Sequence, residues 1–138
     1  MPVALACLLG FAAWAILLVA VLAASRAAQV LTGRKRSNEF PSGIQHGGER
    51  YWRLNRAHVN TVENLPIFAT IVLVGAVVHT STPTFGLLAG VVLAARVVQS
   101  LVHISSGSEL AVNVRFTAFI TQLLCYVWML TEIVRAAG

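Results

Sequence analysis

The stretch from Arg53 to Pro66, RLNRAHVNTVENLP, places charged and amide side chains at the start of a segment that is otherwise apolar. The uncharged run IFATIVLVGAVV follows it directly. A charged residue at the centre of a bilayer costs roughly 2.5 to 3.5 kcal/mol, so these residues need a structural or functional reason. At 100° per residue, five of them share one face of a helix: Arg53, Arg56, Asn60, Glu63 and Asn64.

Two later segments repeat this pattern of one polar face on an apolar helix. Arg96, Gln99, Ser100 and His103 follow the i, i+3, i+4, i+7 spacing. Further on, Gln122 follows Arg115 by two turns on the same side. We expect the three faces to lie in the same half of the membrane. A single glutamate needs a single partner, whereas several arginines are available here, so the pattern favours an anion-accepting cavity over a purely structural network.

Composition places the whole chain in a bilayer. Of its 138 residues, 57% are hydrophobic and 11% are charged, and the mean hydropathy is +0.77. A membrane-spanning helix needs about 20 largely apolar residues. The sequence therefore predicts an all-α integral membrane four-helix bundle with up-down topology, as one domain covering residues 1–138. The expected spans are 3–25, 55–79, 84–104 and 112–136, with a loop over 26–54.

The distribution of basic residues predicts the orientation. The loop over 26–54 carries most of the Lys and Arg, whereas the connection HTSTPT carries neither. By the positive-inside rule the loop is cytoplasmic and both termini lie on the other side. The net charge of +5 does not indicate nucleic acid, because the basic residues cluster at helix ends and in this loop. The first apolar run has no preceding positive charge and is read as a retained span rather than a signal peptide.

Histidines and cysteines show no metal-ligand spacing, and we expect no metal. His58 and His79 fall near helix ends and are read as interfacial residues. Cys7 and Cys125 lie in apolar runs and are read as packing residues, because a lone buried cysteine usually behaves as a small hydrophobe.

The stretch RLNRAHVNTVENLPIF resembles the signature of the MAPEG family, the membrane-associated proteins of eicosanoid and glutathione metabolism. The second helix of that family reads approximately Arg-x-x-Arg-Ala-x-x-Asn-x-x-Glu-x-x-Pro. Every element of this signature is present here, as Arg53, Arg56, Ala57, Asn60, Glu63 and Pro66. The resemblance extends to the chain length, the four spans, the basic first loop and an arginine that opens the fourth helix.

This resemblance implies a homotrimer in which glutathione, the co-substrate, binds in a cytoplasm-facing pocket between neighbouring subunits. It also implies a bacterial-type member, located in the bacterial inner membrane. The expected function is that of a membrane-bound glutathione-dependent transferase or peroxidase acting on lipophilic electrophiles through an arginine-stabilised thiolate. The expected partners are the lipid bilayer, a lipophilic small molecule and two further copies of the chain, with no nucleic acid.

By position, Arg115 resembles the arginine that activates the thiol in this family, and Arg56 resembles a member of its internal polar network. The residues expected to bind glutathione are Arg26, Arg53, Asn60, Glu63, Arg96, Gln99 and His103. The chain departs from the family where several members carry tyrosines near the thiol. Phe116 and Phe119 stand in early helix four instead, and the chain's tyrosines, Tyr51 and Tyr126, are expected to lie elsewhere.

Two alternative functions stay open. One is a nonenzymatic glutathione- or lipid-binding protein of the same family, which binds without conjugating. The other is a small proton-coupled exporter that uses Glu63. The arginines on the same helix face as Glu63 disfavour this exporter, because they would hold the carboxylate ionised.

Overall fold

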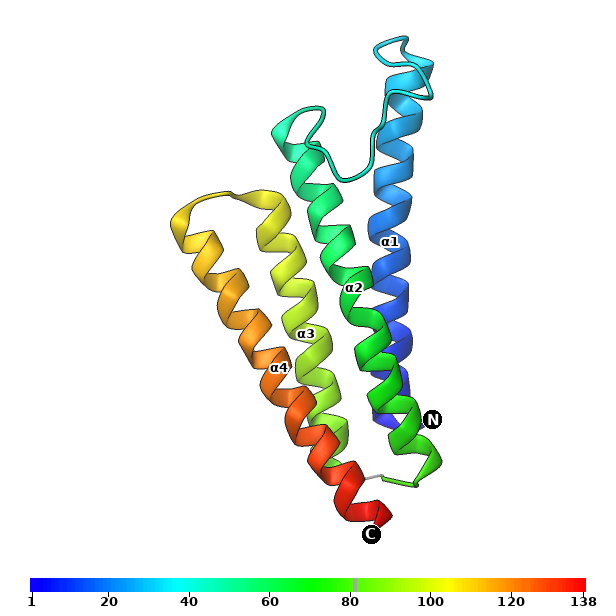
Figure 1. The fold of residues 1–138 in the computed structure, drawn as a ribbon, viewed down its shortest axis with the longest axis vertical. Coiled ribbons are helices and arrows are strands. Elements are labelled where there is room, and N and C mark those ends of the chain that lie inside the picture. Colours follow the sequence, from blue (N-terminus) through cyan, green and yellow to red (C-terminus); the bar gives the residue numbers. More distant parts are fainter. Residues whose placement is uncertain (81) are drawn as a thin grey trace.

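Four α-helices make up the protein in this computed structural model, which describes residues 1–80 and 82–138. Across these ranges no strand is present. Figure 1 shows the helices side by side, each reversing the direction of the one before it. The predicted all-α, four-helix, up-down fold is therefore confirmed. The helices are α1 (Val3–Leu31), α2 (Glu49–Val77), α3 (Pro83–Ser105) and α4 (Glu109–Ala137).

Local sequence signals explain where the last two helices begin. Thr82 caps α3, since its hydroxyl oxygen accepts a hydrogen bond from the backbone N–H of Phe85, and Pro83 occupies the first turn. Ser108 caps α4 in the same way by accepting from the N–H of Ala111. Pro66 lies inside α2, which continues unbroken on both sides of it. A proline removes one backbone hydrogen bond, and a long membrane helix tolerates this loss.

The helices are longer than the expected spans. Both α1 and α2 contain 29 residues, or about 43 Å at 1.5 Å per residue, against roughly 30 Å of hydrocarbon. Helix α1 continues to Leu31 and α2 begins at Glu49, so only residues 32–48 of the expected 26–54 loop are non-helical. Hydropathy locates the apolar part of a helix, but polar turns at its end continue the same backbone hydrogen bonding.

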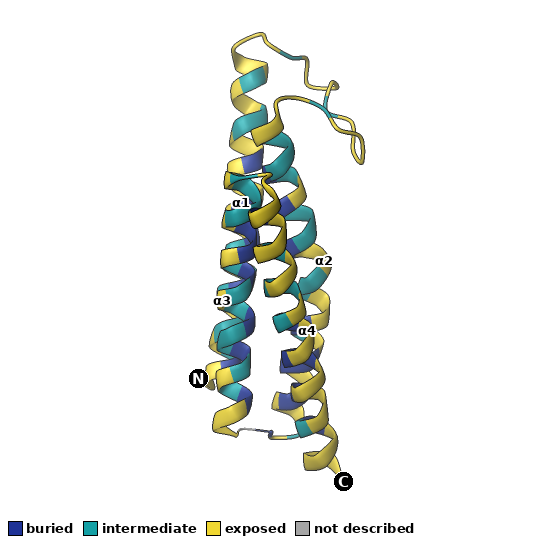
Figure 2. Cartoon of the chain, turned by 90° about the vertical axis from the view of Figure 1, so that its left-hand side faces the viewer, coloured by how far each residue is buried: buried dark blue, intermediate teal, exposed yellow. Residues whose placement is uncertain are grey.

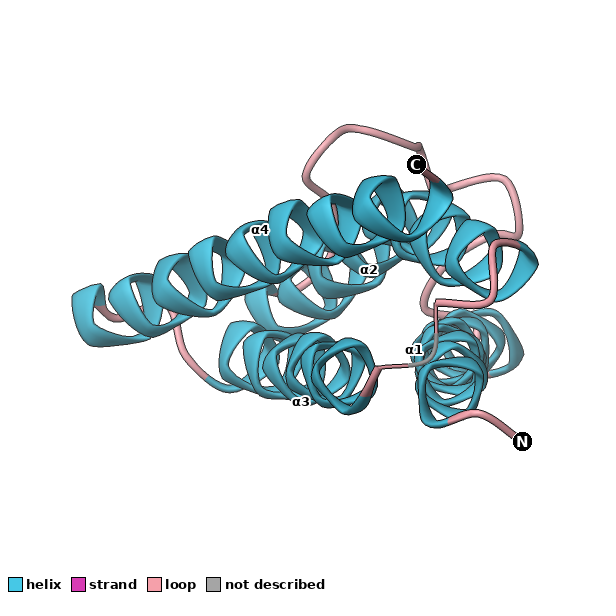
Figure 3. Ribbon diagram, turned by 90° about the horizontal axis from the view of Figure 1, so that it is seen from below, coloured by secondary structure: helices cyan, strands magenta, loops and turns pink. Residues whose placement is uncertain are grey.

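The α1–α2 and α3–α4 connections lie at one end of the bundle, and both termini lie at the other (Figure 1). Viewed along the bundle, α4 packs on α3 and on the edge of α2 (Figure 3). Among the described residues the backbone of α4 does not approach that of α1, whereas the backbones of α1, α2 and α3 all lie close to one another.

Buried residues line the inner sides of the helices, and the outer surfaces are exposed (Figure 2). The main core joins all four helices through Phe11, Phe68, Phe85 and Met129, with Phe11 and Phe68 ring centroids 5.4 Å apart. Large apolar side chains such as Ile16 and Leu124 point outward. All four helices are long and apolar enough to cross a membrane. The chain is a multi-pass membrane protein whose apolar exterior faces lipid.

Candidate functional site

A cavity of about 430 Å³ lies between α2, α3 and α4. It collects the polar faces that the sequence places on these three helices. Helix α2 contributes amides and a carboxylate, α3 contributes an arginine, an amide and an imidazole, and α4 contributes an arginine together with apolar side chains. The lining residues are Asn60, Glu63, Asn64, Arg96, Gln99, His103, Val112, Arg115, Phe116 and Phe119.

Arg96 is the most deeply buried charge at this cavity. Its side chain is only 1% exposed, and its Nη1 donates a 3.2 Å hydrogen bond to the backbone carbonyl of Asn60. Its guanidinium carbon lies 5.6 Å from the centre of the Phe11 ring. Nε and Nη2 find no hydrogen-bond partner, and over residues 1–80 and 82–138 no carboxylate pairs with Arg96. A buried guanidinium without a counter-charge is destabilising, and an anion bound in the cavity would offset this cost.

A chain of side-chain amides connects α3 to α4 at the level of Arg115. Gln99 Nε2 donates 3.1 Å to the backbone carbonyl of Arg115, and Gln99 Oε1 accepts 3.2 Å from Gln122 Nε2. Gln122 also donates to the carbonyl of Ala118, 2.9 Å away. Gln99 and Gln122 are both buried. These bonds fix the backbone from which the half-buried Arg115 side chain reaches the cavity.

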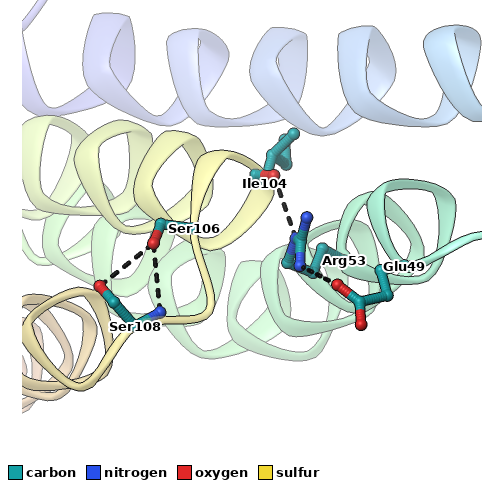
Figure 4. Close-up of polar contacts among 5 residues, drawn as sticks. All are labelled: Glu49, Arg53, Ile104, Ser106 and Ser108. Carbon is teal, nitrogen blue, oxygen red and sulfur yellow. Dashed lines mark hydrogen bonds and ion pairs between the residues drawn. The ribbon is translucent and has the colours of Figure 1, made fainter.

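The turn that precedes α4 also helps to position Arg115. Ser108 donates its backbone N–H to the Ser106 hydroxyl, and the two hydroxyls lie 3.1 Å apart (Figure 4). Ser108 in turn caps the first turn of α4. The helix therefore starts at a defined residue, and Arg115 follows within two turns.

Helix α2 provides the opposite wall of the cavity. The backbone carbonyl of Asn60 accepts from Arg96 and also from Asn64 Nδ2, at 2.9 Å. The Asn60 side-chain amide makes no hydrogen bond within the part of the chain that the structure describes, and Asn60 lines the cavity. Glu63 is exposed at the cavity and makes no ion pair within the part of the chain that the structure describes. The arginine partner that the helix face of α2 indicated for Glu63 is thus absent from those residues, and its carboxylate is available to a ligand.

Three of the arginines singled out in the sequence lie outside this cavity. Arg53 pairs with Glu49 at 3.1 Å and donates from Nε to the carbonyl of Ile104 (Figure 4). Arg26 donates from Nε to the Tyr51 hydroxyl at 2.8 Å. Arg56 is exposed on α2. The single chain therefore brings together Asn60, Glu63, Arg96, Gln99, His103 and Arg115, and leaves Arg26, Arg53 and Arg56 outside.

Asn64, which the sequence places on the polar face of α2, and Val112 line the cavity although neither was among the residues expected to bind glutathione. Both carry a helical signal that could have found them. Asn64 follows Asn60 by one turn, and Val112 precedes Arg115 by three residues, so each shares a face with a predicted site residue. Neither tyrosine lines the cavity: Tyr126 packs in the core against Phe68.

The remaining wall of the cavity is apolar and comes from α4. Phe116 directly follows Arg115, Phe119 lies one turn beyond Arg115, and the Phe116 side chain is largely exposed. The cavity therefore has a charged inner wall and an apolar outer wall. Within residues 1–80 and 82–138, no group of three His, Cys, Asp or Glu side chains is arranged to hold a metal ion.

The model of the MAPEG family matches residues 3–135, which is nearly the entire chain. The chain belongs to the MAPEG family. The resemblance carried by the α2 signature is thus confirmed, and this MAPEG protein is a membrane protein of the glutathione and eicosanoid metabolism family. No curated protein matches it.

Proposed function

We propose that this MAPEG protein is a glutathione-dependent transferase or peroxidase that acts on lipophilic electrophiles and assembles as a homotrimer. The observation that carries the proposal is Arg96, a buried guanidinium with no carboxylate partner among the described residues, at the wall of a cavity that also holds Arg115. A cavity of about 430 Å³ lies within the usual range of small-ligand sites.

The charges along the cavity complement those of glutathione, which carries two carboxylates, one ammonium group and a thiol. We assign one carboxylate to Arg96, since a guanidinium binds a carboxylate through two parallel hydrogen bonds. The ammonium group is assigned to Glu63, whose carboxylate is free of ion pairs in the described ranges. The amide side chains of Asn60 and Asn64 then face the peptide groups.

Arg115 is assigned to the thiol. A free thiol has a pKa near 8.5, and an adjacent guanidinium lowers the thiol pKa by favouring the thiolate, which is the nucleophile. The thiolate attacks the electrophilic carbon, a carbon–sulfur bond forms, and the leaving group departs with its bonding electrons. Arg115 and the surrounding amides thus work by orientation and charge stabilisation, without a covalent intermediate on the protein.

The apolar outer wall supports a lipophilic second substrate. Phe116 and Val112 line the cavity and are also exposed on the membrane-facing surface of α4. A molecule dissolved in the bilayer can reach the polar wall along these side chains without crossing water. We infer that the second substrate enters from the lipid.

In the proposed trimer, Arg26 and Arg53 of an adjacent chain bind the second carboxylate of glutathione in exchange for their partners within the single chain, Tyr51 and Glu49. These two arginines lie outside the cavity of their own chain. We further propose that the protein resides in the bacterial inner membrane with residues 32–48 in the cytoplasm, following the positive charge of that segment.

A nonenzymatic glutathione-binding protein is the second candidate, and one observation favours it. No tyrosine lines the cavity, and Phe116 and Phe119 lie along the wall next to Arg115. Without a hydroxyl donor, the thiolate depends on Arg115 alone. Such a protein would bind glutathione but would not conjugate it.

Two measurements on purified protein in detergent test the proposal. Calorimetry measures glutathione binding, and the ultraviolet absorbance of the thiolate reports its ionisation at the site. Conjugation of a chromogenic electrophile then separates an enzyme from a binding protein. Binding with thiolate formation and conjugation supports the transferase, and binding without conjugation supports the second candidate. No binding of glutathione would contradict both.

A further inference from the structure

A second cavity, about 470 Å³ in volume, lies between α1, the start of α2 and the end of α3. It shares no lining residue with the candidate glutathione site, and α4 does not contribute to it. Most of its wall is aliphatic. The aliphatic lining residues are Leu17, Leu18, Val21, Leu54, Leu101 and Ile104.

The length of this groove matches one leaflet of a bilayer. Its wall on α1 extends from Trp14 to Ser25, which corresponds to about 16 Å along a helix that rises 1.5 Å per residue. Half of a hydrocarbon core is about 15 Å thick. Leu17 and Leu101 are 51% and 52% exposed, so the groove opens outward rather than into the sealed core. An extended acyl chain from one leaflet fits these dimensions.

The polar end of the groove is cationic. Arg50 lines it there, next to Tyr51, whose hydroxyl is held by Arg26 Nε at 2.8 Å. The loop folds back over this end, since the Phe40 ring lies 6.5 Å from the Tyr51 ring and the Lys35 ammonium lies 5.3 Å from the centre of Phe40. Two cations that are not assigned to glutathione, Lys35 and Arg50, therefore lie at the polar end of the groove.

The nearby carboxylates do not neutralise these cations. Glu49 forms its ion pair with Arg53, and Glu39 accepts a hydrogen bond from the backbone N–H of Arg36. In the part of the chain that the structure describes, neither Arg50 nor Lys35 has an ion pair. An aliphatic groove of one-leaflet length thus ends at an uncompensated positive charge.

We propose that this groove binds one anionic phospholipid, with an acyl chain between α1 and α3 and the headgroup phosphate at Arg50. A zwitterionic lipid would fill the groove equally well but would carry an ammonium group to the cationic end. Each lysine or arginine near a membrane surface favours an anionic lipid by roughly fivefold. The proposal goes beyond glutathione chemistry and assigns the loop and the first turn of α2 a separate ligand.

Native mass spectrometry of the full-length protein tests the lipid preference. The protein in detergent is incubated with equal amounts of phosphatidylglycerol and phosphatidylcholine that carry identical acyl chains. We expect phosphatidylglycerol to be retained in at least about fivefold excess. In Arg50→Gln this excess falls by about fivefold, whereas Arg34→Gln, which removes the same charge from an exposed loop position outside the groove, leaves it unchanged.

A second pair of variants tests the aliphatic part of the groove. Leu17→Trp fills the groove and is expected to abolish retention of both lipids. Ile16→Trp introduces the same side chain at a position that is 65% exposed and does not line the groove, and we expect wild-type retention. Val21→Phe is the replacement if Leu17→Trp does not fold, as judged by helical circular dichroism. Glutathione binding, measured in parallel, reports on the other cavity alone.

Three results would overturn the proposal. Equal retention of the two lipids would remove the role of the cationic end. An identical loss in Arg50→Gln and Arg34→Gln would show that the preference follows overall charge rather than this groove. Retention of phosphatidylglycerol by both Leu17→Trp and Val21→Phe would place the lipid elsewhere on the protein.

Discussion

The side-chain amide of Gln99 in α3 donates a 3.1 Å hydrogen bond to the backbone carbonyl of Arg115 in α4. The oxygen of the same amide accepts a hydrogen bond from the side chain of Gln122, which lies two turns beyond Arg115 in α4. Helix α4 packs only on α3 and the edge of α2 among the described residues, so these bonds are its polar attachment beside the cavity. The position of the Arg115 backbone therefore depends on two glutamines, Gln99 and Gln122. Gln122 does not line the cavity and acts only through Gln99.

Gln122→Leu is expected to loosen this attachment. The substitution removes the donor to Gln99 Oε1, and interhelical hydrogen bonds in membranes contribute about 0.6 to 1.7 kcal/mol. We expect thermal unfolding in detergent to show a loss of stability in that range, together with a lower conjugation rate. Thr117→Val removes an exposed hydroxyl that bonds only within α4 and serves as the control. Equal stability of the two variants would contradict a role for the amide chain.

Arg115→Ala is expected to lower the rate of conjugation far more than the affinity for glutathione. Loss of the adjacent guanidinium raises the thiol pKa, and a change of one to two pKa units lowers the thiolate fraction near neutral pH by about 10- to 100-fold. The rate should recover as the pH rises towards the pKa of the free thiol. Arg135→Ala, at the opposite end of α4, provides the charge-matched control. If Arg115→Ala loses rate and affinity equally, Arg115 contributes uniform binding instead.

Arg96→Met is expected to weaken glutathione binding without lowering the stability of the protein. The substitution removes a buried cation that has no carboxylate partner in the described ranges, at the loss of one hydrogen bond to Asn60. Replacing a buried charge by an apolar side chain of similar length is often neutral or stabilising. Unfolding experiments should therefore show unchanged or higher stability, while glutathione affinity falls at least about tenfold. A less stable protein with intact binding would show that Arg96 is purely structural.

Glu63→Gln is expected to weaken glutathione binding through the ammonium group. A hydrogen bond to a charged group contributes about 1.5 to 3 kcal/mol, so the affinity should fall by about tenfold or more. A glutathione analogue that lacks the amino group should bind wild type and Glu63→Gln equally. Calorimetry with the four combinations measures this coupling directly. If the variant weakens both ligands to the same degree, the carboxylate does not contact the ammonium group.

Gly75→Ala is expected to destabilise the contact between α2 and α3. A Cβ at this position would lie 2.6 Å from Cζ of the buried Phe85 ring, so the ring or one of the two helices must shift. Overpacking of this kind costs about 1 to 3 kcal/mol. Gly90→Ala is the matched control, because a Cβ there meets no atom within 4 Å and alanine favours a helix. A loss of thermal stability in both variants would contradict this difference.

The features that could be predicted from the sequence are those that depend only on hydropathy and on the helical period. The four helices and their order follow from hydropathy, and the shared faces of Asn60 with Glu63 and of Arg96 with Gln99 and His103 lead to one cavity. Helical geometry fixes these faces before any packing occurs. Family membership followed from the α2 signature in the same way.

The positions of the remaining arginines depend on partners that spacing does not reveal. Arg53 shares the α2 face with Asn60, but it lies outside the cavity because Glu49 and the carbonyl at the end of α3 attract it. Arg26 bonds to Tyr51, a residue 25 positions away that the loop brings back to α1. A long, flexible side chain at a helix end bonds to the nearest acceptor, and that acceptor is known only once the helices have packed.

The extra helical turns at the ends of α1 and α2 carry residues 32–48 beyond the apolar part of these two helices. A small epitope inserted between Gly43 and Ile44, two exposed residues of this segment outside both helices, would be accessible to an antibody. Whichever side of sealed vesicles binds the antibody then identifies the compartment that the segment faces.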